Sequence, residues 1–203
     1  MSTNKHQESK YRNSRRMADP NGIRSSLFLD GVAQKDTIKD WKHLLKPDKY
    51  KEFIISSWQE LTKRNQIIIY AFIIMPNHLH IVWEMKEPND KEIGAPMRPH
   101  ASFNKFTSHM ILKDLSMNHP NVLPYLKVDE KERQYRFWQR DPLAVLMDSK
   151  LKVEQKITYM HKNPLHERWN LVSRQESYRW SSAEFYESGK DEFGILTHYS
   201  ERF

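Results

Sequence analysis

The sequence predicts an α+β fold, in which a central antiparallel β-sheet carries helices on one face. Two apolar runs, residues 66–75 and His78–Met85, are rich in β-branched and aromatic side chains, and the turn Pro76-Asn77 separates them. Such a pattern is typical of a β-hairpin. Helical periodicity precedes and follows the hairpin, and the order helix, hairpin, helix, strand, helix favours a sandwich of one sheet and packed helices.

Three segments have the apolar spacing of amphipathic helices, at residues 41–63, 102–116 and 149–163. Pro47 and Asp48 lie where the first helix would begin, and Asp148 or Ser149 can cap the third. Pro164 ends that third helix. Residues 135–139 are expected to form a further strand and residues 122–127 a possible short one, with loops between them.

The composition bounds the class of protein. A chain of 203 residues is long enough for one domain with a sizeable core. Its formal net charge of +7 favours a polyanionic partner, nucleic acid before an anionic membrane, although surplus lysine can also serve solubility alone. The absence of cysteine excludes disulfides and thiolate zinc sites and agrees with a cytoplasmic location.

No membrane segment is expected. The most apolar stretch, residues 67–75, is much shorter than the roughly 20 residues that cross a bilayer. Residues 1–10 contain no apolar run and do not resemble a secretory signal.

Two regions are predicted along the chain. Residues 1–26 are polar and basic and are expected to form a disordered arm, with or without phosphate contacts. Residues 27–203 are expected to form one catalytic domain with an irregular C-terminal tail. Only residues 26–29 of the region before the first helix look strand-like, so we expect the first edge strand to be short or missing.

The pair His78 and His80 is the first candidate for chemistry. Side chains alternate along a strand, so these two imidazoles share one face, while Leu79, Ile81 and Trp83 form the apolar core face. The separation of roughly 7 Å along the backbone suits two ring nitrogens that grip one divalent ion. A bare His-x-His is more often incidental than metal-binding, and that alternative stays open.

Tyr159 is the second candidate, on the third predicted helix. Lys152, Lys156 and Asn163 lie on the same side of this helix, about a quarter-turn from its core face. A phenol near positive charge and a metal has what a phosphodiester nucleophile needs, because both favour the phenolate. The alternative is a packed aromatic with its hydroxyl at the surface.

Four segments, in order, resemble a known family. The run YAFIIMPNHLHIVWEM, residues 70–85, resembles the histidine–hydrophobic–histidine ("HUH") strand of single-tyrosine transposases of the insertion-sequence type. YMHKNP, residues 159–164, resembles the tyrosine helix of the REP-associated tyrosine transposases, and FWQRD and YRWSSA, residues 137–141 and 178–183, are similar to the same branch. The resemblance covers roughly residues 41–199.

This resemblance implies an RRM-like or ferredoxin-like sandwich and a metal-dependent endonuclease and strand transferase acting on single-stranded DNA. His78, His80 and Asn163 would hold Mg²⁺ or Mn²⁺, and Tyr159 would form a 5′-phosphotyrosine link with a free 3′-hydroxyl. Two imidazoles suit transition metals better than magnesium, which favours manganese in vitro. The implied substrate is hairpin DNA from palindromic repeats, and the implied state is a monomer or a homodimer.

A wider basic set is predicted to contact phosphates: Lys105, Lys152, Lys156, Arg136 and Arg140. Plain solvation of these side chains is the competing interpretation. The alternative function is a catalytically silent or domesticated DNA-binding protein of the same fold, and a remote one is an RNA-binding module with exposed aromatics on its sheet. An intact set of His78, His80, Tyr159 and Asn163 favours the enzyme, because binding alone does not need it.

Overall fold

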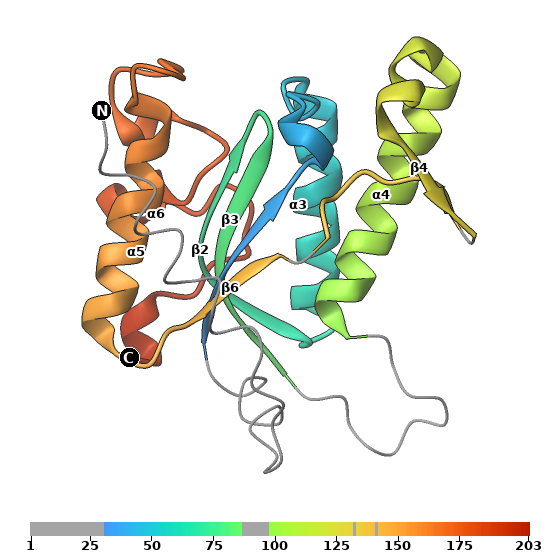
Figure 1. Ribbon diagram of the computed structural model, residues 1–203. Helices are drawn as coiled ribbons and strands as arrows, with labels where there is room; N and C mark the ends of the chain where they lie inside the picture. Colours follow the sequence, from blue (N-terminus) through green and yellow to red (C-terminus); the bar gives the residue numbers. More distant parts are fainter. Residues whose placement is uncertain (1–30, 87–97, 132, 141) are drawn as a thin grey trace, which may run out of the picture.

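The computed structural model describes residues 31–86, 98–131, 133–140 and 142–203 (Figure 1). Four antiparallel strands form the central sheet in the order β2-β3-β1-β6. Their bounds are β1 (Val32–Thr37), β2 (Ile67–Met75), β3 (His78–Met85) and β6 (Leu143–Leu146). The predicted α+β class with a central antiparallel sheet is confirmed. The predicted arm, residues 1–26, lies outside the described residues.

The predicted hairpin is confirmed as β2 and β3, which pair from Ile67 opposite Met85 to Met75 opposite His78. Eight of the nine residues of β2 are buried, as expected of a β-branched and aromatic run with covered faces. The register shifts once, between Ile69 and Ala71, where Tyr70 is the extra residue.

The first strand corrects the expectation of a short or missing edge strand. β1 lies inside the sheet, between β3 and β6, and pairs with β3 over its whole length. Its sequence, VAQKDT, has no apolar alternation, because its stability comes from hydrogen bonds on both sides and from polar partners for Gln34 and Asp36. The strand-like residues 26–29 lie outside the described residues.

Helices cover both faces of this sheet (Figure 1). On one side lie α3 (Asp48–Lys63) and α4 (Pro99–Asn118), whose Trp58 and Phe103 rings stack with centroids 5.7 Å apart. On the other side lies α5 (Lys150–Lys162), which contacts β2 and β3. The three predicted helices are therefore present. Their prediction on one face of the sheet is wrong, because α5 packs on the face opposite α3 and α4, where it helps to bury β2 and β3.

The region after α4 differs from its prediction. Residues 120–126 form the 3₁₀ helix η3 (Pro120–Leu126), and β4 (Lys127–Glu130) pairs with β5 (Arg133–Tyr135) in a separate hairpin. The predicted strand 135–139 is wrong beyond Tyr135. Instead, the chain turns so that Phe137 and Trp138 are buried, and Trp138 forms a single bridge with Ile38.

The C-terminal tail is better ordered than predicted. It contains η5 (Gln175–Ser177), α6 (Ala183–Ser188) and η6 (Tyr199–Glu201), and it lies along the outer edge of β2. Ile74 N–H donates to the Trp180 carbonyl at 2.8 Å, and Thr197 N–H donates to the Ile69 carbonyl at 2.9 Å. The tail thus satisfies backbone groups that would otherwise be an exposed sheet edge. Two short 3₁₀ turns complete the fold, η2 (Lys39–Trp41) and η4 (Asn163–Leu165).

Within the described ranges, no helix combines the length and the apolar character that a membrane crossing requires.

Candidate active site

The two histidines of β3 meet on the sheet face that α5 covers. The ring centroids of His78 and His80 are 5.1 Å apart and their planes are nearly perpendicular, at 89°. Both side chains are buried, with 6% and 3% of their surface exposed. Alternation along β3 places Trp83 on the opposite face, where its ring meets His100 of α4. The predicted division of β3 into an imidazole face and a core face is therefore present.

Both imidazoles are held neutral. Burial lowers the pKa of His78 to about 3, helped by the positive charges of Lys35 and Arg168. Burial also lowers the pKa of His80 well below its ordinary value, and Lys156 adds to this effect. A neutral imidazole keeps one ring nitrogen unprotonated, and this is the form that binds a metal ion.

The ring nitrogens differ in their partners. His78 Nδ1 lies 2.6 Å from Oδ1 of Asn77, so this nitrogen carries the proton and Nε2 keeps the lone pair. His80 Nδ1 is buried and has no hydrogen-bond partner among the described residues, and the same holds for Nδ2 of Asn163. A buried polar atom without a partner costs about 1–3 kcal/mol. The unpartnered Nδ1 of His80 leaves a buried ring nitrogen on the imidazole face of β3 that a bound ligand would satisfy.

Tyr159 reaches this pair from α5. Its ring centroid is 6.1 Å from that of His80, at an interplanar angle of 82°, although 79 residues separate the two positions in the chain, counted as 159 minus 80. Tyr159 is 54% exposed, so a ligand in solvent can reach this residue. The Lys156 ammonium lies 5.3 Å from the Tyr159 ring centroid. The structure therefore brings together the phenol, the imidazole pair and a cation.

The position of α5 depends on a buried hydrogen-bond chain. His161 Nε2 lies 2.8 Å from Ser182 Oγ, and Ser182 Oγ in turn lies 3.0 Å from Phe72 N and 3.2 Å from Phe72 O. This chain joins α5, the tail and β2. His161 therefore has a structural position, and it helps to fix the helix that carries Tyr159.

Three site residues were not predicted from the sequence. Lys35 stands opposite His80 in the register of β1 and β3, and its pKa is lowered by burial and by the nearby Lys156 and Arg168. Trp41 and Trp169 flank His78, with ring centroids 6.2 and 6.1 Å from the imidazole. The alternation that places Lys35 on this face becomes visible only once β1 is known to cover residues 32–37.

The remaining predicted site residues lie in different parts of the fold. Asn163 is buried at the end of α5, and no hydrogen bond joins its side chain to either imidazole among the described residues. Lys152 forms an exposed ion pair with Asp148 at 2.6 Å. Lys105, Arg136 and Arg140 line a groove beside α4, on the other side of the sheet from Tyr159.

The imidazole pair fits a divalent cation. His78 and His80 supply two neutral imidazole nitrogens, and the position of Asn163 as a third ligand stays a prediction. No group of three or more histidine, aspartate or glutamate side chains in metal-binding proximity occurs in the part of the chain that the structure describes. Two neutral imidazoles are compatible with manganese or another transition metal.

A solved structure of a REP-associated tyrosine transposase bound to a REP hairpin superposes on 85% of this chain and 90% of its own, with a TM-score of 0.54 and 15% sequence identity. The protein shares the fold of that transposase. A candidate transposase from Deinococcus radiodurans R1 matches 72% of this chain and 97% of its own at a TM-score of 0.37 and 13% identity. No family model and no curated protein matches the chain. At 15% identity the likeness establishes the fold.

Proposed function

We propose that this protein is a metal-dependent tyrosine transposase that cleaves and rejoins single-stranded DNA. The observation that carries the proposal is the 6.1 Å separation between the Tyr159 and His80 rings. A strand and a helix that are far apart in the chain converge there on an accessible phenol and two buried neutral imidazoles. The shared fold with a REP-associated tyrosine transposase supports the same conclusion.

The proposed reaction is a phosphoryl transfer with Tyr159 as the nucleophile. The phenol loses its proton, and its oxygen forms a bond to the phosphorus of a DNA phosphodiester while the bond from phosphorus to the 3′ oxygen breaks. The products are a 5′-phosphotyrosine link and a 3′-hydroxyl, which takes up a proton. Attack by a 3′-hydroxyl on the phosphotyrosine reverses the step and joins DNA ends, so no high-energy cofactor is consumed.

Lys35 and Lys156 supply positive charge to this reaction. Both are partly buried and their pKa values are lowered by that burial, so their charges are imperfectly solvated in the free protein. A scissile phosphate placed between the imidazoles and α5 would interact with the ammonium groups of Lys35 and Lys156 in place of water. Partial burial strengthens such interactions, because the local dielectric is lower than that of water.

His78 and His80, with Asn163, would hold Mn²⁺ or Mg²⁺, which supplies Lewis-acid polarisation of the phosphate when bound. The imidazoles are suited to this because both are neutral and His78 is oriented by Asn77. Lys35, Lys156 and Arg168 oppose a bare cation at this position, and a DNA phosphate would neutralise them. We therefore expect the protein to bind Mn²⁺ more tightly when DNA is present.

The proposed substrate is hairpin DNA with an unpaired segment, such as that of a palindromic repeat. The net charge of +7 favours a polyanion. The structural neighbour was solved with a REP hairpin, which supports hairpin DNA over other nucleic acids.

A covalent-adduct assay tests the proposal. Labelled hairpin DNA with single-stranded flanks is incubated with the protein and Mn²⁺, and adducts that survive denaturing electrophoresis are counted. We expect an adduct with the wild-type protein and with Tyr125→Phe, which alters another exposed tyrosine, and none with Tyr159→Phe. DNA binding without any adduct would instead support the alternative, a DNA-binding protein that does not cut.

A further inference from the structure

A groove of about 760 Å³ lies beside α4, bounded on its other side by β5 and the residues that follow it. Four lysine and arginine side chains line it among the described residues: Lys105, Arg133, Arg136 and Arg140. The groove is on the side of the sheet that faces away from Tyr159. Alternation along β1 establishes this, because Asp36 points to α4 and contacts His100, whereas Lys35 points to the imidazole face.

The charge of the groove is only partly neutralised. Glu130 pairs with Arg136 and, at 2.7 Å, with Arg140. No acidic partner is found for Lys105 or Arg133 within the described residues. Among the described residues, one carboxylate therefore faces four lysine and arginine side chains. An anionic ligand would meet Lys105 and Arg133 without breaking an ion pair within that part of the chain.

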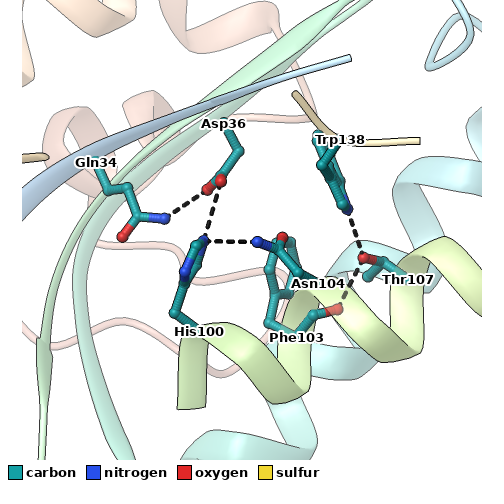
Figure 2. A network of polar contacts seen from close by, with 7 residues as sticks. All are labelled: Gln34, Asp36, His100, Phe103, Asn104, Thr107 and Trp138. Carbon is teal, nitrogen blue, oxygen red and sulfur yellow. Dashed lines mark hydrogen bonds and ion pairs between the residues drawn. The ribbon is translucent and has the colours of Figure 1, made fainter. Parts of the chain in front are cut away.

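His100 lines the groove. A buried carboxylate holds this histidine, as Figure 2 shows. His100 Nε2 lies 3.0 Å from Asp36 Oδ1, and Gln34 Nε2 donates to Asp36 Oδ2 at 2.7 Å. The Asn104 amide lies 2.9 Å from the same ring nitrogen. Nε2 is thus occupied, while Nδ1 of His100 has no partner among the described residues and remains for a ligand.

This arrangement is costly if it is only structural. Asp36 is 3% exposed, and a buried carboxylate is tolerated only with good hydrogen bonds and a charge partner. An apolar pair would fill the same space between β1 and α4 without that cost. The Asp36 carboxylate also fixes the orientation of the His100 imidazole at the groove.

Trp138, which also lines the groove, is held in position by a hydrogen-bond chain. Trp138 Nε1 donates to Thr107 Oγ1 at 2.9 Å, and Thr107 Oγ1 donates to the Phe103 carbonyl at 2.8 Å (Figure 2). Gln139 N–H donates to the Thr37 carbonyl at 2.7 Å and ties the same segment to the end of β1. The backbone between Arg136 and Arg140 is thereby tied to α4 and to β1.

We propose that this groove binds one strand of unpaired nucleic acid, at a site separate from the Tyr159 site. Lys105 and Arg133 would contact phosphates, and the half-buried ring of Tyr135, also in the lining, would stack on a base. The volume is in the range of about 300–1,000 Å³ that holds small ligands, which suits a short strand and is too small for a duplex. The choice of nucleic acid over another polyanion rests on the proposed function.

Binding is measured in the Tyr159→Phe protein without metal, so that the outcome does not depend on cleavage. The probe is a short fluorescent oligothymidylate, followed by anisotropy. The test variant is Lys105→Ala/Arg133→Ala, and the matched control is Lys63→Ala/Lys113→Ala, which removes two exposed charges that do not line the groove. Circular dichroism verifies that both variants are folded.

We expect the groove variant to bind at least about tenfold more weakly at 100 mM salt and to lower the slope of log affinity against log salt by about 1.4, for two lost phosphate contacts. A 5-bromodeoxyuridine strand should crosslink to Tyr135. Equal binding by the groove and control variants, crosslinks confined to α5, or equal competition by thymidine 5′-monophosphate would each overturn the proposal. Loss of adducts in the covalent assay, with groove binding intact, would refute only the cleavage activity.

Discussion

Replacing Lys156 by methionine tests how the surroundings of Tyr159 contribute to the proposed reaction. The substitution keeps the aliphatic part of the side chain and removes the charge 5.3 Å from the Tyr159 ring centroid. Over that distance, two unit charges interact by about 0.8 kcal/mol in water and by about 3 kcal/mol at an effective dielectric constant near 20. Because Tyr159 is 54% exposed, the lower part of this range applies, about 1 kcal/mol.

Lys156→Met should therefore slow adduct formation about fivefold at saturating DNA. Stability should stay equal or rise, because burial already lowers the pKa of Lys156 and so disfavours its charged form in the folded protein. The assay is the single-turnover rate of adduct formation, together with a thermal melt.

Lys152→Met is the matched control on the same helix, since Lys152 pairs with Asp148 at the surface. Its rate should change less than about twofold, as expected of an exposed ion pair. The reasoning is refuted if Lys156→Met leaves the rate unchanged, or if Lys152→Met slows it as much.

Three further predictions follow from the same geometry. His80→Ala should abolish adduct formation and weaken Mn²⁺ binding measured by electron paramagnetic resonance, with the fold retained; unchanged Mn²⁺ binding would remove His80 from the metal site. Burial lowers the pKa of His78 to about 3 and of His161 to about 4, so below pH 6.5 the unfolded chain takes up protons that the folded protein does not. The free energy of unfolding, measured by urea titration, should therefore be highest above pH 6.5 and fall towards pH 4. The fall should be shallower in His161→Gln. A free energy of unfolding that does not change with pH would contradict this. Ser182→Ala should cost about 1–3 kcal/mol in urea unfolding, because it leaves buried His161 Nε2 unpaired, whereas exposed Ser188→Ala should cost much less.

The sequence predicts those parts of the fold whose signals are local. The apolar runs on either side of Pro76-Asn77 specify β2 and β3, and alternation within His78–Met85 separates the imidazole face from the core face. Apolar spacing likewise places Tyr159 opposite the buried side of α5, whose Val153, Ile157 and Met160 are all in the core. These features depend on neighbours within a few residues of one another.

Other parts depend on partners that are far away in the chain. β1 has a polar sequence, and only pairing with β3 and β6 makes it a strand, so neither its place in the sheet nor Lys35 in the site could be read from residues 32–37 alone. Arg168 and Trp169 reach His78 from the tail, where no periodic signal exists. The turn after Tyr135 follows from burial of Trp138 against Thr107, which is 31 residues away.

Peptide mapping of the covalent adduct tests the central claim most directly. After incubation with hairpin DNA and Mn²⁺, nuclease digestion leaves a nucleotide on the attacked residue, and trypsin then releases residues 157–162, ITYMHK, because Lys156 precedes this peptide and Lys162 ends it. Mass spectrometry should find the nucleotide mass on Tyr159 in that peptide. A nucleotide attached to another residue, with ITYMHK unmodified in the adduct, would contradict the assignment of the nucleophile.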